Sequence, residues 1–166
     1  MNKISAKMIA RTAIISALYA VCTLIFAPIS YGAVQFRISE CLCVLAFFYP
    51  EGIIGLTIGC FIANLFGNGP LDIIFGTLAT LVASILSFVV AKRIKKPTLR
   101  FFASASFPII INALVIPLTF LAITEIKELY FISLLQVFIG QAVVILSLGS
   151  FIYFAILRIS SKRGHL

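Results

Sequence analysis

The segment at residues 37–64 reads RISECLCVLAFFYPEGIIGLTIGCFIAN, and it decides how often the chain crosses a membrane. Its only charged residues are Arg37, Glu40 and Glu51, and Pro50 interrupts it near the middle. The segment can form one helix kinked at Pro50, or two short helices joined by a turn at residues 49–51. The first arrangement gives five crossings for the whole chain, and the second gives six.

The rest of the sequence is also poor in charge. Of its 166 residues, 62% are hydrophobic and 11% are charged, and the mean hydropathy is +1.20. An ordinary soluble domain is about a quarter charged. This composition excludes a soluble enzyme and a disordered chain. It predicts a single polytopic membrane domain over residues 1–166.

Five uncharged runs, each of at least 19 residues, occupy positions 12–36, 52–71, 73–91, 101–124 and 129–157. A helix that crosses the hydrocarbon core needs about 20 apolar residues. The runs are continuously apolar and lack the alternation of barrel strands, so they predict helices.

Positive charge favours six helices over five, because Lys and Arg concentrate in cytoplasmic loops. Six helices place 11 of the 13 basic residues on one side and leave Arg37 and Lys127 on the other. The fold expected is therefore an all-α, six-helix bundle with cytoplasmic N and C termini and with Glu51 in a solvated turn. The predicted helices are 10–29, 33–49, 52–66, 71–91, 103–123 and 129–157.

Residues for catalysis, metal binding or cofactor binding are not apparent. The sequence has no phosphate-binding loop, and its single histidine is His165 in the tail. The four cysteines lie in apolar runs and are expected to pack as small apolar side chains. We expect no catalytic residue, no metal, no cofactor and no nucleic-acid partner.

A stripe of alanines marks one face of the first helix. Spacings of 4, 3, 4 and 3 residues keep its members on one side, where another helix can approach closely in lipid. The stripe predicts either a docking face for another membrane protein or packing within the bundle. Its members are Ala6, Ala10, Ala13, Ala17 and Ala20.

Polar residues gather toward the outer end of the predicted bundle, where ionisable groups at membrane depth indicate function. Three acids, Glu40, Asp72 and Glu125, lie there, and Arg37 is spaced to pair with Glu40 on one helix face. The alternatives are an N-terminal helix charge for Asp72, a solvated charge for Glu125 and interhelical hydrogen bonds for the glutamines. The candidate binding residues are Gln35, Arg37, Glu40, Asn64, Phe66, Asp72, Asn112, Gln136 and Gln141.

Several of these residues stand in motifs that resemble the QueT-type proteins. The motifs are YG at 31–32, QFRISE at 35–40, FYPE at 48–51, GC at 59–60, ANLF at 63–66 and LDIIFGTLAT at 71–80. The similarity is specific over roughly residues 10–92. It implies a substrate-binding S component of an energy-coupling factor (ECF) transporter in a prokaryotic cell membrane. The implied substrate is a queuosine precursor, chiefly 7-aminomethyl-7-deazaguanine.

The resemblance also implies partners and roles. An AxxxA motif on the first helix, matched by Ala6–Ala10 and Ala13–Ala17, would dock on a transmembrane coupling subunit that works with two cytoplasmic ATPase subunits. From the chemistry of such a ligand we expect Glu40 to accept the paired donors of the deazaguanine, with Arg37 orienting Glu40 or donating to the ring carbonyl, and Asp72 to accept the aminomethyl cation. The loop between the first two helices would cap the site.

Three other functions fit the same sequence. The chain could be an S component for another vitamin or nucleobase, a non-transporting membrane scaffold, or a self-sufficient secondary carrier. A scaffold has no need for Arg37, Glu40 and Asp72 near one face.

Overall fold

The computed structural model describes residues 5–32, 34–67, 69–124 and 127–162, and every regular element in these ranges is a helix. The α-helices are α1 (Ala6–Ile25), α2 (Ala27–Ser30), α3 (Pro50–Asn64), α4 (Thr77–Arg93), α5 (Pro97–Thr124), α6 (Lys127–Val144) and α7 (Ser150–Lys162). A 3₁₀ helix, η1 (Ile38–Phe47), and two π-helical turns, η2 (Asp72–Gly76) and η3 (Ile145–Gly149), complete the order.

Four helical stretches of the described chain are long and apolar enough to cross a membrane. They are Ala6–Ile25, Asp72–Arg93, Pro97–Thr119 and Leu129–Lys162, and η1 and α3 are shorter apolar helices. Large apolar side chains such as Ile25, Phe131 and Phe151 are 68–77% exposed on the outside of the bundle, as expected for a lipid-facing surface. The prediction of an all-helical chain with long apolar helices is confirmed for the described residues.

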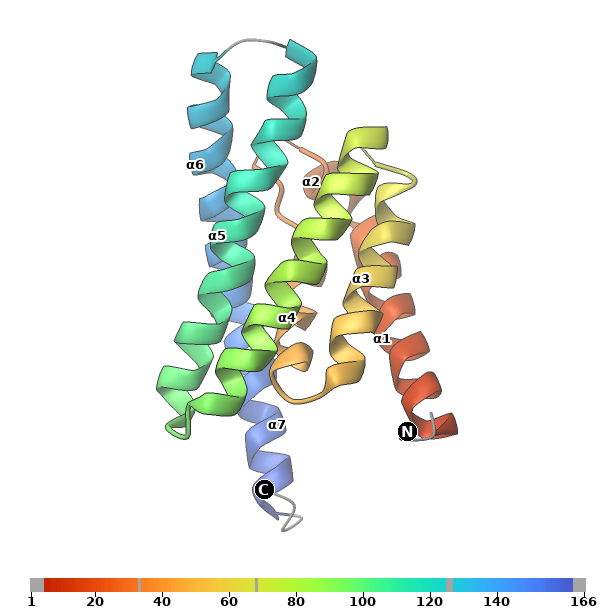
Figure 1. Cartoon of the computed structure of the whole chain (residues 1–166), viewed down its shortest axis with the longest axis vertical. Coiled ribbons are helices and arrows are strands. Elements are labelled where there is room, and N and C mark those ends of the chain that lie inside the picture. Colours follow the sequence, from red (N-terminus) through yellow and green to blue (C-terminus); the bar gives the residue numbers. More distant parts are fainter. Residues whose placement is uncertain (1–4, 33, 68, 125–126, 163–166) are drawn as a thin grey trace.

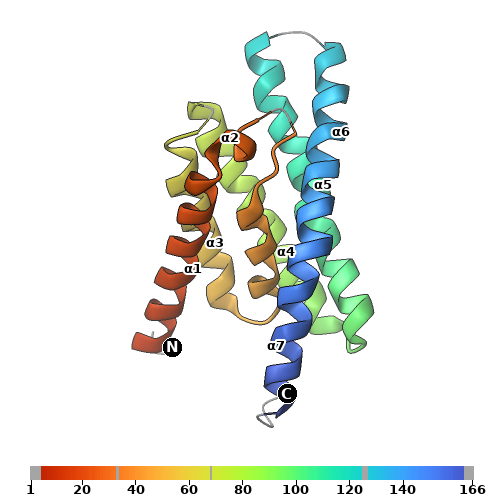
Figure 2. The ribbon, with the colours of Figure 1, turned by 180° about the vertical axis from the view of Figure 1, so that it is seen from behind.

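The long helices run side by side, and the first and last described helices point to the same end of the molecule (Figure 1). The connection between α4 and α5, which carries Lys95 and Lys96, also lies at this end. In the view from behind, α6, η3 and α7 form one long continuous helix beside α5 (Figure 2).

The 3₁₀ helix η1 occupies the middle of the bundle, where it contacts α1, α3, α4, α5, α6 and α7. Its residues Val44 and Ala46 are fully buried. Small residues allow this close packing: a Cβ at Gly52 of α3 would lie 2.7 Å from the backbone nitrogen of Ala46. Residues at the start of η1 are therefore held in the interior of the bundle.

The structure corrects the helix predicted at 33–49. Residue 33 lies outside the described residues, and the backbone is not helical at 35–37 before the 3₁₀ helix begins at Ile38. A 3₁₀ helix rises about 2.0 Å per residue, against 1.5 Å for an α-helix. The ten residues of η1 therefore span about 20 Å instead of about 15 Å. In the 3₁₀ form, the same number of residues spans a greater length than it would as an α-helix.

The turn before α3 also differs from expectation. Glu51, expected in solvent, is only 7% exposed. Its carboxylate lies 3.5 Å from the guanidinium of Arg11 on α1, and that guanidinium stacks 4.9 Å from the ring centre of Tyr49. The turn is thus folded against α1, and Glu51 is buried because α1 supplies its counter-charge.

Candidate functional site

A buried ion pair joins the start of η1 to the start of η2. The guanidinium Nη2 of Arg37 donates to Oδ2 of Asp72 at 2.9 Å. The two residues are 2% and 1% exposed. A pair so completely removed from solvent is costly to break, because the remaining partner would be an uncompensated buried charge.

Glu40 does not pair with Arg37, so the predicted pairing on one helix face is wrong. The extended backbone of Arg37 (φ −79°, ψ 94°) places this residue before the helix begins, and the i, i+3 rule holds only within a helix. Glu40 instead accepts a 2.6 Å hydrogen bond from the hydroxyl of Tyr19 on α1. The sequence analysis missed Tyr19, although a tyrosine inside an apolar span usually needs a hydrogen-bond partner.

Asn64 and Cys60 at the end of α3 support the Asp72 turn. The amide Nδ2 of Asn64 donates to the backbone carbonyl of Asp72 at 3.0 Å and lies 3.4 Å from the thiol of Cys60. The hydroxyl of Thr80 donates to the same sulfur at 3.2 Å. Cys60 therefore does more than fill apolar space, because it accepts polar contacts from α3 and α4.

Gly76 leaves the room that this arrangement needs. A Cβ at this position would lie 2.8 Å from Oδ1 of Asp72 and 2.9 Å from Nδ2 of Asn64. Any larger residue in the last position of η2 would displace one of these side chains. The π-helical turn and its glycine thus fix Asp72 against α3.

Gly140 of α6 has a similar role for Gln35. A Cβ at Gly140 would overlap the carbonyl oxygen of Val34, so α6 packs directly on the backbone at 34–35. Gln35 has a φ of 47°, in the left-handed region that non-glycine residues rarely adopt. Its side chain is nevertheless fully buried, which shows that tertiary packing imposes this conformation.

Tyr31 covers the ion pair from the connection between α2 and η1. Its ring centre lies 5.7 Å from the guanidinium of Arg37, and its hydroxyl donates to the carbonyl of Ala63 at 2.6 Å. Tyr31 lies beyond the candidate membrane spans. Burial raises the pKa of this hydroxyl, which keeps it a hydrogen-bond donor at neutral pH.

Several buried polar atoms of the candidate binding residues have no hydrogen-bond partner within the part of the chain that the structure describes. Buried polar groups are nearly always paired, and leaving one unpaired costs about 1–3 kcal/mol. Donors and acceptors both occur in this set, which is chemically suited to a planar polar molecule. The atoms are Arg37 Nε, Gln35 Nε2 and Oε1, Asn64 Oδ1, Asp72 Oδ1, Asn112 Oδ1, and Gln141 Nε2 and Oε1.

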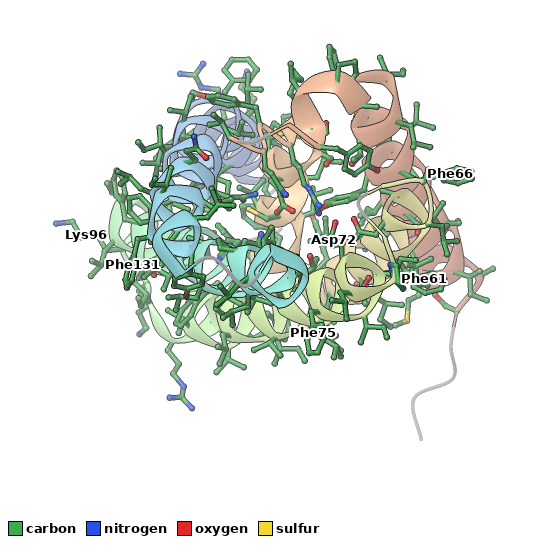
Figure 3. All side chains as sticks on the ribbon, turned by 90° about the horizontal axis from the view of Figure 1, so that it is seen from above. Phe61, Phe66, Asp72, Phe75, Lys96 and Phe131 are labelled. Carbon is green, nitrogen blue, oxygen red and sulfur yellow. The ribbon has the colours of Figure 1, made fainter. Side chains whose placement is uncertain are left out.

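Of the nine predicted binding residues, seven are buried and two, Phe66 and Gln136, are not. Phe66 is 70% exposed, and Figure 3 shows it at the periphery with Phe75, while Asp72 lies in the interior. An aromatic residue on the outer surface cannot stack on a ligand in the interior. Gln136 is only half-buried on α6. Glu125, the third predicted acid, lies outside the described residues.

The alanine stripe is divided between the outside and the inside of the bundle. Ala6, Ala10, Ala13 and Ala17 are exposed, whereas Ala20 is 6% exposed and packs in the core. The inclusion of Ala20 in a docking face was therefore wrong. Ala20 is buried because α1 packs against η1 at this level, where Tyr19 contacts Glu40.

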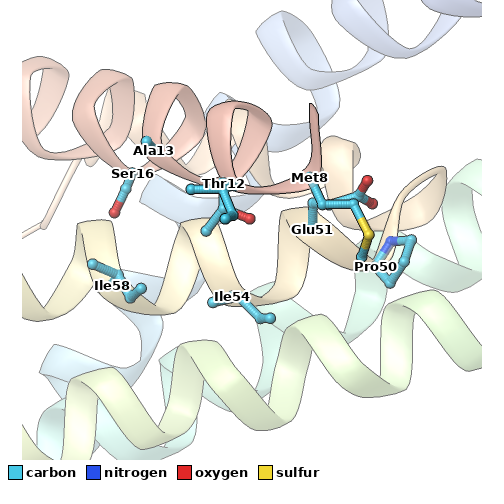
Figure 4. Close-up of a pocket in the computed structure, with 9 residues that line it drawn as sticks. Met8, Thr12, Ala13, Ser16, Pro50, Glu51, Ile54 and Ile58 are labelled. Carbon is cyan, nitrogen blue, oxygen red and sulfur yellow. The ribbon is translucent and has the colours of Figure 1, made fainter. Parts of the chain in front are cut away.

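An apolar groove of about 470 Å³ runs between α1 and α3 beside the exposed alanines. Figure 4 shows Met8, Thr12, Ala13 and Ser16 on the α1 side, and Pro50, Glu51, Ile54 and Ile58 on the α3 side. The groove is open to the surface that the exposed part of the stripe occupies.

Comparison with known proteins gives a match to the QueT transporter family over residues 9–158. The chain is also 41% identical over 98 residues to the queuosine precursor transporter QueT of Lactococcus lactis subsp. cremoris (strain MG1363). That alignment covers 58% of this chain and 58% of the relative. No solved structure matches the chain.

Proposed function

The chain belongs to the QueT transporter family, and we propose on that basis that it is the substrate-binding S component of an ECF-type importer. Family membership and the four long apolar helices indicate that the chain is a multi-pass membrane protein and part of a transporter. The proposed substrate is a queuosine precursor, either 7-aminomethyl-7-deazaguanine or a related deazaguanine. The observation that supports this assignment is the set of buried polar atoms without a hydrogen-bond partner among the described residues, which includes Nε of Arg37 and Oδ1 of Asp72.

The proposed recognition begins with Glu40. A deazaguanine presents an N–H and an NH₂ donor side by side, and one carboxylate accepts both in a charge-assisted, bidentate contact. Glu40 is buried and bonded to Tyr19 through one oxygen. A carboxylate has about four lone-pair positions, so it retains acceptors for both ligand donors.

The Arg37–Asp72 pair serves the other end of the ligand. Asp72 binds Arg37 through Oδ2, while its Oδ1 has no hydrogen-bond partner among residues 5–32, 34–67, 69–124 and 127–162. In this proposal Oδ1 accepts the aminomethyl ammonium, and Nε of Arg37 donates to the ring carbonyl. Gln35, Asn64, Asn112 and Gln141 complete the polar edge. A site built this way rejects analogues that lack the matching groups, because its own buried atoms would stay unpaired.

The proposed topology has six crossings with both termini in the cytoplasm of a prokaryotic cell. Its support is that the first and last described helices point to the end that also holds the basic connection between α4 and α5, as expected for cytoplasmic loops. The two short crossings are η1 and α3. The helix η1 is packed inside the bundle, whereas α3 lies against α1 and α4 and exposes Ile54, Ile58 and Phe61 on its outer face.

The proposed partners are a transmembrane coupling subunit and two cytoplasmic ATPase subunits, which would supply the energy. The exposed alanines Ala6, Ala10, Ala13 and Ala17 and the neighbouring groove form the proposed contact with the coupling subunit. Small residues let a partner helix approach closely where hydrophobic driving force is lacking.

Isothermal titration of the purified protein with the deazaguanine series tests the substrate. We expect 7-aminomethyl-7-deazaguanine to bind more tightly than guanine or a pyrimidine. Mass spectrometry of copurifying small molecules checks the same assignment without a prior choice of ligand. Binding of an unrelated vitamin, with no response to deazaguanines, would leave the fold and family in place and overturn the substrate.

A further inference from the structure

We propose that Tyr19 is a positioning residue that orients Glu40, and that this orientation makes the site select ligands with two adjacent donors. The inference rests on the proposed function, because it takes Glu40 as the acceptor of the deazaguanine edge. It concerns a residue of α1, the helix that otherwise presents the alanine face.

The Tyr19–Glu40 contact joins two elements in the centre of the protein. Tyr19 is fully buried and Glu40 is 2% exposed. The hydroxyl donates to Oε1 of Glu40 at 2.6 Å, which is short enough for a charge-assisted bond. Such a bond fixes one carboxylate oxygen and therefore the plane of the carboxylate.

Tyr19 is itself held rigidly by its neighbours. A Cβ at Gly59 of α3 would lie 2.7 Å from Cβ of Tyr19, so α1 and α3 touch at this level. One turn along α1, the Thr23 hydroxyl lies 2.6 Å from that of Ser39 and donates to the Tyr19 carbonyl at 2.9 Å. The tyrosine ring has little freedom to follow Glu40 if the carboxylate turns.

The chemical consequence concerns the geometry of acceptance. With Oε1 held by Tyr19, the remaining lone pairs of both oxygens face fixed directions. A guanine-type edge fills both directions with its N–H and NH₂ groups. A hypoxanthine-type edge, which lacks the NH₂ group, leaves one oxygen without a donor. Without the tyrosine hydroxyl, the carboxylate can rotate to suit a single donor, and the discrimination between the two edges falls.

The experiment measures a ratio of affinities. Wild type, Tyr19→Phe and the matched control Tyr153→Phe are each titrated with 7-aminomethyl-7-deazaguanine and with its 2-deamino analogue. Tyr153→Phe also removes a buried tyrosine hydroxyl, which accepts from Arg100 and donates to the carbonyl of Pro97, but it leaves the Tyr19–Glu40 bond in place. We expect wild type and the control to prefer the guanine-type ligand by about tenfold or more, and Tyr19→Phe by less than about threefold.

The ratio separates positioning from a merely structural effect. Both affinities are measured on the same protein preparation. A misfolded fraction therefore lowers the measured stoichiometry and leaves the ratio of the affinities unchanged.

Three results have distinct meanings. If the ratio of the two affinities in Tyr19→Phe equals that of wild type, including the case in which both ligands bind more weakly by the same factor, the positioning role is overturned. A wild-type protein that binds both ligands equally also overturns it, while leaving deazaguanine uptake in place. A wild-type protein that binds neither ligand contradicts the proposed function itself, and the inference with it.

Discussion

Replacing Arg37 with Met tests the buried ion pair most directly. The change removes the guanidinium but keeps a side chain of similar length that packs in apolar surroundings. Asp72 then loses the donor to its Oδ2, and its Oδ1 already lacks a hydrogen-bond partner among the residues that the structure describes. Asn64 does not compensate, because its amide contacts the backbone carbonyl of Asp72.

The expected loss of stability follows from this burial. Both side chains are at most 2% exposed, so water cannot replace the lost partner, and removing one member of such a pair costs about 3–5 kcal/mol. Asp72→Leu leaves Arg37 unpaired at a similar cost. The double variant Arg37→Met/Asp72→Leu removes both charges and should recover most of the loss, because an apolar replacement of a buried pair is often nearly neutral.

The assay is unfolding in mixed micelles, followed by far-UV circular dichroism because the chain has no tryptophan. A double-mutant cycle then gives the coupling energy between the two residues. We expect a coupling of at least about 2 kcal/mol. Single variants as stable as wild type, or a double variant whose loss is the sum of the two, would refute the reasoning.

Three further predictions concern binding and assembly. Glu40→Gln should weaken deazaguanine binding at least about tenfold, because the amide places an NH₂ donor where one carboxylate oxygen would accept a ligand donor; unchanged affinity by titration calorimetry would remove Glu40 from the site. Gly76→Ala should weaken binding while the helices remain folded, since the added methyl group meets Oδ1 of Asp72; titration beside a circular dichroism spectrum checks this, and wild-type affinity would contradict it. Replacing both Ala13 and Ala17 with Leu should abolish copurification with the coupling subunit and leave ligand binding intact, because both residues are exposed; a complex that still forms would show that this face does not dock.

The sequence by itself was enough to locate the buried amide side chains of the described residues. A polar side chain in a continuous apolar run must find a partner inside the protein, so its type and position alone identify it as structural or functional. Gln35, Asn64, Asn112 and Gln141 were identified in this way, and each is at most 2% exposed. The long helices could also be predicted from the sequence. The predicted spans at 71–91 and 103–123 lie within or at the edge of helical stretches that the structure shows.

The tertiary structure alone decided which of these residues meet. Arg37 is 35 residues from Asp72, and Glu40 is 21 residues from Tyr19. Spacing rules describe neighbours three or four residues apart on one helix, and they give no information on how helices cross. The same limit explains the 3₁₀ form of η1 and the burial of Ala20. Both depend on how closely neighbouring helices pack, which the local sequence of either segment does not encode.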